Sequence, residues 1–409
     1  MELQELDSWA DEFEAFHARF ADLFSRQEPR DQSRKYLRAL LSAVERKNGW
    51  QLAEAGGDER PDATQRLLYL AQWEADAARN RLQHFVIEVF GDAEGIGVVD
   101  ESGFIKKGDK SVGVQRQYSG TAGKRENCQI GTFLSYASCH GHVFLDRRLY
   151  LPESWAAAPD RRTQAKVPES EVFATKPQQA VKMLQHAWAM GVPMRWVTGD
   201  EVYGDSPTLR ETVADSGRWY VLAVRTHLTV WLKRSPVAVP AWRGTGRKPV
   251  KERVLEEETV HAIPVSVVVA SWPESRWQRW KVAEGEKGPR IYDWACQRIV
   301  ENQEQLPGRD AWLLARRSTT DPTEIAYYLS NAPVETDLLT LAQVASTRYT
   351  VEQCIEEAKG ETGLDQYEVR YWHSWYRHIT LSMMAHAWLA SIRLQHNREK
   401  GAKNPSWRN

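Results

Sequence analysis

Three acidic residues, far apart in the sequence, have the chemistry of a divalent-metal site. Asp100 follows an apolar run rich in β-branched residues, and Asp200 follows a second short apolar run that begins at Met194. Both runs predict buried strands that end on a carboxylate. Glu352 falls in a helical pattern over residues 340–361. Hard divalent cations bind oxygen ligands, and two ions about 3.5–4 Å apart can clamp the attacking and leaving oxygens of a phosphoryl transfer. The three acids therefore predict metal-dependent phosphoryl transfer.

The predicted helix over residues 340–361 carries two further polar residues of interest. Glu352, Glu356 and Lys359 lie at positions i, i+4 and i+7, which places them on one helix face. If the register of the helix differs from this prediction, Glu356 takes the place of Glu352 as the third acid of the site. Lys359 either positions a phosphate or forms an i, i+3 pair with Glu356.

Positive charge is concentrated after the first acid. These cations are candidates for contacts with backbone phosphates, and the alternative is that they belong to two solvated loops. They are Lys106, Lys107, Lys110, Arg116, Lys124 and Arg125. A second group in the amino-terminal region has the same potential role: Arg34, Lys35, Arg38, Arg46 and Lys47.

The order of the acids, with Arg348 four residues before Glu352 and Lys359 seven residues after it, resembles the DDE transposases of bacterial insertion sequences. Arg348, Glu352 and Lys359 match the Arg, Glu and Lys of the family signature Tyr-x2-Arg-x3-Glu-x6-Lys. The Tyr position of that signature falls on Ala345, which is a departure. Tyr349 stands where many relatives have Trp.

Two longer stretches are similar to one branch of this family, the insertion-sequence 701-type branch. They read Asp-Glu-Ser-Gly-Phe-Ile-Lys-Lys-Gly over residues 100–108 and Thr-Gly-Asp-Glu-Val-Tyr-Gly over residues 198–204, and a third such stretch reads Gly-Val-Gln-Arg-Gln-Tyr-Ser-Gly-Thr-Ala-Gly over residues 113–123. Members of this branch carry a mostly β insertion between the second Asp and the Glu. The resemblance runs from about residue 45 to residue 390.

The resemblance implies an α/β fold with an RNase H-like mixed-sheet catalytic core, a β-rich insertion and an all-helical amino-terminal domain. It implies that Asp100, Asp200 and Glu352 are catalytic and bind two Mg²⁺ ions, for which Mn²⁺ can substitute. Arg348 and Lys359 would bind DNA phosphates beside the metals. The implied partners are double-stranded DNA, as terminal inverted repeats and as target, and a second copy of the chain when two ends are paired.

The expected domains follow from these patterns. Residues 1–92 form the helical DNA-end-binding domain, 93–225 the first part of the core, 226–335 the insertion, 336–395 the second part of the core with carboxy-terminal helices, and 396–409 a basic tail.

The periodicity of the sequence predicts particular elements within these domains. Helices fill residues 1–90, interrupted by a turn at residues 27–30. The core contains strands at 113–118, 128–138, 141–151 and 219–224, and helices at 177–190 and 206–215. The insertion contains strands at 258–272, 276–282, 311–316 and 324–329. Strand, strand, strand, helix, strand, helix is the order of an RNase H-like core.

Bulk composition restricts the interpretation less than the motifs do. The 409 residues contain 54 Lys and Arg against 55 Asp and Glu, so a DNA-binding surface requires local patches of positive charge. The four cysteines lack the short paired spacing of a zinc site. No signal pattern and no apolar run of membrane-spanning length is present, which predicts a cytoplasmic protein. The resemblance implies that it is bacterial and associated with the nucleoid.

Two alternatives to transposition remain. An RNase H-like nuclease would cut DNA without joining it, but the helical head and the insertion both favour recognition of DNA ends. A domesticated, non-catalytic DNA-binding protein would not need carboxylates at all three positions.

Overall fold

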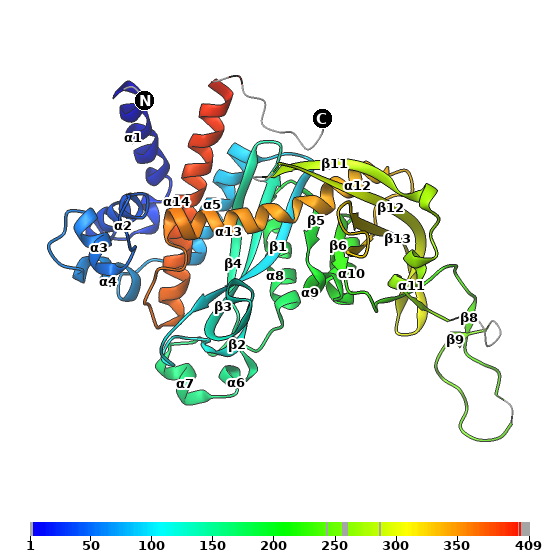
Figure 1. Cartoon of the computed structure of the whole chain (residues 1–409). Helices are drawn as coiled ribbons and strands as arrows, with labels where there is room; N and C mark the ends of the chain where they lie inside the picture. Colours follow the sequence, from blue (N-terminus) through cyan, green and yellow to red (C-terminus); the bar gives the residue numbers. More distant parts are fainter. Residues whose placement is uncertain (1–2, 243, 256–260, 286–287, 400, 402–409) are drawn as a thin grey trace. The chain divides into compact units, whose positions relative to one another are not determined.

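The chain forms two compact units in the computed structural model, which describes residues 3–242, 244–255, 261–285, 288–399 and 401. The first unit contains Met1–Arg195 together with Tyr349–Asn409, and the second contains Trp196–Arg348. Figure 1 shows the elements of both units coloured along the sequence. Among the described residues, no helix is both long enough and apolar enough to span a membrane.

The amino-terminal part of the first unit is helical, as predicted. Its helices are α1 (Leu3–Ala18), α2 (Gln27–Leu40), α3 (Gly49–Ala55), α4 (Asp62–Tyr69) and α5 (Ala75–Phe90). The long helix α14 (Trp372–Glu399) packs against α1, α2, α4 and α5. The turn predicted at residues 27–30 is wrong, because these residues form the first turn of α2. Pro29 is tolerated there, since the first N–H groups of a helix have no partner within the helix.

An antiparallel sheet forms the rest of the first unit. Its strands are β1 (Gly95–Ile105), β2 (Gln115–Ser119), β3 (Lys124–Ser138) and β4 (Gly141–Leu149). The long strand β3 pairs with β1 along one edge, and with β2 and then β4 along the other. The strands predicted at 113–118, 128–138 and 141–151 are therefore confirmed, but β2 and β4 lie along the same edge of β3 rather than on either side of it as in a meander. The prediction that the first strand ends at Asp100 is wrong, because β1 continues through Asp100 to Ile105.

Helices cover the two faces of this sheet. On one face, Glu101 of β1 bonds to Lys176, and Thr132 of β3 bonds to Gln179; both partners belong to α8 (Lys176–Ala189). Because side chains alternate along a strand, Asp100 points to the other face. Helix α13 (Tyr349–Thr362) lies there, across β1, β3 and β4 (Figure 1).

The second unit begins at Trp196, within the first strand of the parallel part of the core. Strand β5 (Met194–Gly199) is followed by α9 (Glu201–Gly204), α10 (Pro207–Asp215) and β6 (Trp219–Val224), which runs parallel to β5. The sequence β1, β3, β4, α8, β5, α10, β6 confirms the element order of an RNase H-like core.

The β-rich segment of the second unit extends this sheet beyond β6. From β6 outwards the strand order is β14 (Ile325–Ser330), β13 (Leu306–Ser318), β12 (Gly288–Gln303), β7 (Thr229–Trp231) and β10 (Ile263–Pro264), and β11 (Gln278–Gly285) also pairs with β12. The strands predicted at 276–282, 311–316 and 324–329 are confirmed by β11, β13 and β14. The short strands β8 (Val237–Ala238) and β9 (Arg253–Val254) pair in an arm that extends from this segment (Figure 1).

The strand predicted over residues 258–272 is wrong for most of the part that the structure describes, because only Ile263–Pro264 forms a strand, β10. Residues 256–260 lie outside the described residues, and Val265–Ala270 forms the short helix α11. Val265, Val268 and Val269 are buried, and their spacing of three and four gives one apolar helix face. This periodicity and the packing that it allows outweigh the β preference of valine.

The single helix predicted over residues 340–361 is two helices. Helix α12 (Leu338–Thr347) ends at its C-cap Arg348, and α13 begins at the next residue. The boundary between the two compact units falls at the same point. Arg348 and Lys359 are therefore not carried by the same helix, contrary to prediction.

Candidate active site

Asp100 lies in the middle of β1, on the face that α13 covers. It is half-buried, and its Oδ1 accepts a hydrogen bond from the backbone N–H of Glu101 at 2.7 Å. The directly paired residue on β3 is Phe133, which is fully buried. Asp100 is thus an acid held by a rigid strand rather than by a loop.

Glu352 lies in the first turn of α13, which packs on β1. Val351, Ile355 and Ala358 belong to the buried face of this helix, whereas Glu352 is half-buried beside that face. Glu356, the alternative in the other register, is exposed. The first unit therefore places the helix of Glu352 on the same face of β1 that carries Asp100.

Asp200 lies in the second unit, directly after β5, as predicted. It is the N-cap of α9, and its Oδ1 accepts a hydrogen bond from the Val202 N–H at 2.9 Å. A side chain at Gly204 would place its Cβ only 1.7 Å from the Ala223 carbonyl oxygen of β6, so α9 approaches β6 this closely only with glycine. Asp200 therefore begins a short helix that is fixed against the sheet.

Arg348 also lies in the second unit, at the C-cap of α12. Burial raises the pKa of the Tyr328 hydroxyl, while the charge of Arg348 lowers it and that of Glu201 raises it. Both charges therefore lie near the Tyr328 ring of β14. Arg348 and Glu201 are 147 positions apart in the numbering, and the fold of this unit brings them to one region.

The donor chemistry of the three acids fits a hard divalent cation. Carboxylate oxygens are the ligands that Mg²⁺ prefers, and none of these acids belongs to a Cys or His cluster that would favour zinc. Within the part of the chain that the structure describes, no three His, Cys, Asp or Glu side chains form a ready-made metal site. The assignment of the ligands therefore rests on residue chemistry and strand position.

Lys359 connects α13 with the turn between β2 and β3. Its Nζ donates a hydrogen bond to Thr121 Oγ1 at 3.1 Å and lies 5.7 Å from the centre of the Phe104 ring. Burial lowers the pKa of the Lys359 amine, although Asp365 and Glu356 act in the opposite direction. Lys359 is thus beside the predicted DNA-binding hairpin.

Lys106 has a packing role that its sequence context did not indicate. Its Nζ donates to the Tyr367 carbonyl oxygen at 2.8 Å and lies 3.5 Å from the centre of the Tyr367 ring. Burial lowers the pKa of the Lys106 amine to about 8, against the opposing charges of Asp365 and Glu368. Lys107, in contrast, is exposed.

The β2–β3 hairpin presents basic side chains to solvent. Arg116, Lys124 and Arg125 are exposed, and Arg125 pairs directly with Tyr118, whose exposed fraction is 63%. Lys124 forms an ion pair with Glu126 at 3.0 Å. The hairpin thus combines positive charge with an exposed aromatic ring, a combination suited to nucleic acid.

One of the amino-terminal cations cannot bind phosphate as predicted. Lys47 is 5% exposed, and its Nζ donates to the Leu40 and Ser42 carbonyl oxygens, the latter at 2.9 Å. It closes the carboxy-terminal end of α2, where backbone carbonyls lack helical partners.

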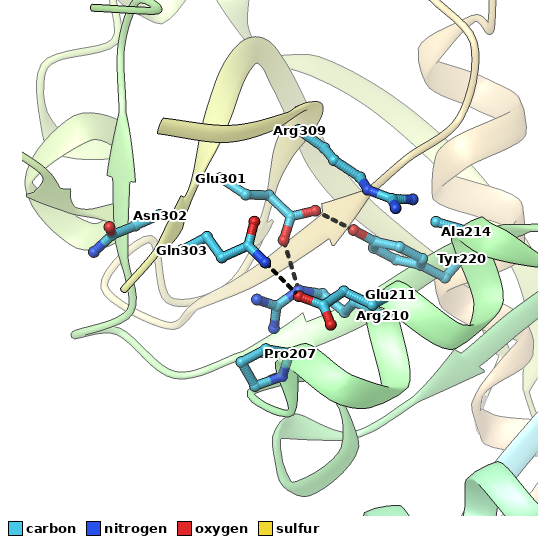
Figure 2. Close-up of a pocket in the computed structure, with 9 residues that line it drawn as sticks. All are labelled: Pro207, Arg210, Glu211, Ala214, Tyr220, Glu301, Asn302, Gln303 and Arg309. Carbon is cyan, nitrogen blue, oxygen red and sulfur yellow. Dashed lines mark hydrogen bonds and ion pairs between the residues drawn. The ribbon is translucent and has the colours of Figure 1, made fainter. Parts of the chain in front are cut away.

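The second unit contains a buried ionic cluster that the sequence did not predict (Figure 2). Glu301 of β12 accepts hydrogen bonds from Arg210 Nε at 2.9 Å and from the Tyr220 hydroxyl. Arg210 also donates to the carbonyl oxygen of Gly204 in α9. The adjoining cavity of about 20 Å³ has room for one water, so it is not a substrate site. No local pattern could reveal it, because Arg210 and Glu301 belong to distant segments.

The chain has a mixed α/β core in the predicted order, with acids on its first strand, after a later strand and on a following helix, which is the arrangement expected of a DDE enzyme. The chain belongs to the DDE superfamily endonuclease family, whose family model matches residues 19–289. The family predicted from the motifs is thereby confirmed, and with it an enzyme of this class. The match includes Asp100 and Asp200 and ends before Glu352, and the roles of all three acids remain predictions.

Individual proteins resemble the chain over most of its length. It is 22% identical over 342 residues to the probable transposase for insertion sequence element IS701 from Microchaete diplosiphon, which covers 83% of this chain and 77% of the relative.

Solved structures give a weaker likeness. The piggyBac transposase synaptic complex with hairpin DNA matches with a TM-score of 0.41 and 12% identity, over 92% of this chain and 68% of that one. The NurA nuclease from Sulfolobus solfataricus matches with a TM-score of 0.27 and 10% identity, over 73% of this chain and 94% of that one. Neither TM-score reaches 0.5.

Proposed function

We propose that the chain is a DNA transposase that cuts the ends of an insertion sequence and joins them to target DNA. The observation that carries this proposal is the similarity to the IS701 protein over 342 residues and 83% of the chain, which is more than the core alone and so includes residues of the helical head, the β-rich segment or both. A nuclease that only cuts DNA would not require both of these additions.

Asp100, Asp200 and Glu352 act together as the metal ligands in this proposal. Two Mg²⁺ ions, or Mn²⁺ in their place, would activate a water and later a DNA 3′-hydroxyl and would stabilise the leaving oxygen. The chain's own contribution is to hold three carboxylates on regular elements: strand β1, the start of α9 and the first turn of α13. Rigid elements hold such ligands more accurately than loops.

The cations have a separate task, which is to bind and orient the DNA backbone. Arg348 and Lys359 would contact phosphates near the acids. Lys106, Lys107, Arg116, Lys124 and Arg125 would extend this contact along the duplex. Of these, Lys107, Arg116, Lys124 and Arg125 have exposed side chains, which supports the assignment. Such contacts hold the DNA in register without reading its sequence.

The partner and the setting follow from the reaction. The substrates are the terminal inverted repeats and the target duplex, and a homodimer is the smallest assembly that can join two ends in concert. The protein would act in the bacterial cytoplasm, at the nucleoid. A domesticated DNA-binding protein and a nuclease without joining activity remain the competing functions.

The test compares Asp100→Asn and Asp200→Asn with Asp109→Asn, which changes an exposed acid in the loop after β1. Cleavage and joining of labelled terminal-repeat DNA are measured together with binding. We expect the first two variants to lose both reactions and to retain binding of the ends, while the third behaves as the wild type. Cleavage without joining by the wild type would favour the nuclease, and binding alone the domesticated protein.

A further inference from the structure

Glu357 of α13 lies at the centre of an ionic cluster that joins three elements of the first unit. Its Oε2 is 3.1 Å from Nε2 of His386 on α14 and 3.4 Å from Nε2 of His142 on β4. Its Oε1 accepts a hydrogen bond from Arg393 Nη1 of α14 at 2.7 Å. The His386 side chain is only 2% exposed and that of Glu357 is 25% exposed. The carboxylate is thus held in a largely enclosed site.

The electrostatics of the cluster favour an ionised Glu357. Burial alone raises the pKa of this carboxyl, but the neighbouring imidazoles of His142 and His386, and then the Arg393 guanidinium, hold it well below its usual range. Burial lowers the pKa of His386, which the neighbouring carboxylate only partly opposes. A charged acceptor in such surroundings forms strong, directional hydrogen bonds.

The position of Glu357 on the helix gives this cluster its significance. An α-helix turns by about 100° per residue, so Glu357 lies about 140° around α13 from Glu352. The apolar face that packs on the sheet lies on the opposite side of the helix, with Glu352 at one border of this face and Glu357 at the other. Apolar packing is non-directional and leaves the rotation of a helix about its axis weakly defined. The contacts of Glu357 with β4 and α14 are directional and so restrict that rotation further.

Helix α13 begins at the boundary between the two compact units, directly after the C-cap of α12. The two helices are separate elements, and the boundary of the compact units falls between Arg348 and Tyr349. The first turn of α13, which carries Glu352, is therefore an end of a helix rather than the interior of one, and helix ends fray.

We propose that Glu357 is a positioning residue that fixes the rotation of α13 and thereby the place of the Glu352 carboxylate. The inference deepens the proposed function and rests on it for its catalytic consequence. Groups that orient metal ligands from outside typically change metal affinity or activity by about 10–100-fold when they are removed.

The test uses Glu357→Gln, which keeps the shape of the side chain and removes its charge. Its matched control is Glu356→Gln, which makes the same change at the exposed neighbouring position. For Glu357→Gln we expect the rate constant of end cleavage to fall by about 10–100-fold and the half-saturating Mg²⁺ concentration to rise, with the Kd for end DNA unchanged. Glu356→Gln should change none of these. The conservative variant Glu357→Asp should recover part of the loss.

Hydrogen exchange provides a readout that does not depend on activity. In Glu357→Gln, the amides in the first turn of α13 should exchange faster, while those of β3 keep the wild-type rate. Arg393→Gln, which removes a half-exposed partner, is the second variant if Glu357→Gln is poorly folded. Unchanged exchange in α13 would overturn the positioning role. So would a loss of cleavage that is fully explained by the fraction of the variant protein that is unfolded. A wild type without cleavage would instead contradict the proposed function, and the exchange data would still decide whether Glu357 holds α13.

Discussion

The Arg210 guanidinium and the Glu301 carboxylate form a buried ion pair, 2.9 Å from Nε to Oε2, with side chains only 5% and 12% exposed. The pair joins α10 of the core to β12 of the β-rich segment. Because Arg210 also donates to the Gly204 carbonyl oxygen, the same guanidinium reaches the end of the short helix that Asp200 begins. The β-rich segment is therefore connected chemically, and not only by strand pairing, to the element that carries the second acid.

Glu301→Gln should destabilise the protein substantially. The change leaves the Arg210 charge without its partner in a buried site, and breaking a buried pair in this way typically costs about 3–5 kcal/mol. The free energy of unfolding from urea titrations measures the effect. The control Glu304→Gln alters an exposed acid in the turn after the same strand, and it should change the stability by less than about 0.5 kcal/mol. Equal stabilities for the two variants would refute the structural role of the pair.

Lys106 should give the stability a particular pH dependence. Its pKa is lowered to about 8 in the folded protein, so between about pH 8 and pH 10.5 the unfolded chain binds the proton more strongly. The free energy of unfolding of the wild type should therefore increase, relative to Lys106→Met, as the pH rises through this window. The increase should be on the order of 1 kcal/mol or more, and urea unfolding at pH 8 and pH 10 measures it.

The comparison variant for this prediction is Lys107→Met, which removes a charge from an exposed position next to Lys106. The two variants also separate packing from DNA binding. If Lys106 is mainly a packing residue, Lys106→Met lowers stability at neutral pH and weakens DNA binding less than Lys107→Met does. A difference between wild type and Lys106→Met that stays constant from pH 8 to pH 10 would contradict the buried-amine interpretation.

The exposed cations of the β2–β3 hairpin should control the salt dependence of DNA binding. Each phosphate contact contributes about 0.9 to the slope of log K against log salt concentration, so Arg116→Gln with Arg125→Gln should reduce the slope by about 2. The loss of affinity should be similar for terminal-repeat and unrelated DNA, because phosphate contacts do not read sequence. Lys182→Gln, on the exposed side of α8, is the control. An unchanged slope in the double variant would show that the hairpin does not belong to the DNA-binding surface.

The elements that the sequence predicted well were those with strong local signals. The cap and glycine around α8 and the Ser206-Pro207 start of α10 each determine their element within a few residues, and β3 was located by the turn residues on either side of it. Asp200 was located correctly for the same reason, since a strand end followed by an N-cap is a local feature.

The errors arose where tertiary packing determines the structure. The end of β1 was placed at Asp100, but pairing with β3 continues through Asp100 to Ile105. The valines of α11 follow a helical spacing that their β propensity concealed. The break at Arg348 contains no glycine or proline that would indicate it in the sequence. The clusters around Glu301 and Glu357 join residues from distant parts of the chain, so no local pattern predicts them.

The most direct test of the central claim is cleavage of labelled DNA carrying the element's terminal repeat by the wild type, Glu352→Gln and Glu356→Gln, with Mg²⁺ and with EDTA. The account predicts nicking at the repeat boundary by the wild type and by Glu356→Gln, only with Mg²⁺, and none by Glu352→Gln despite unchanged binding. Metal-dependent cleavage by Glu352→Gln at the wild-type rate would contradict the assignment of Glu352 as the third acid.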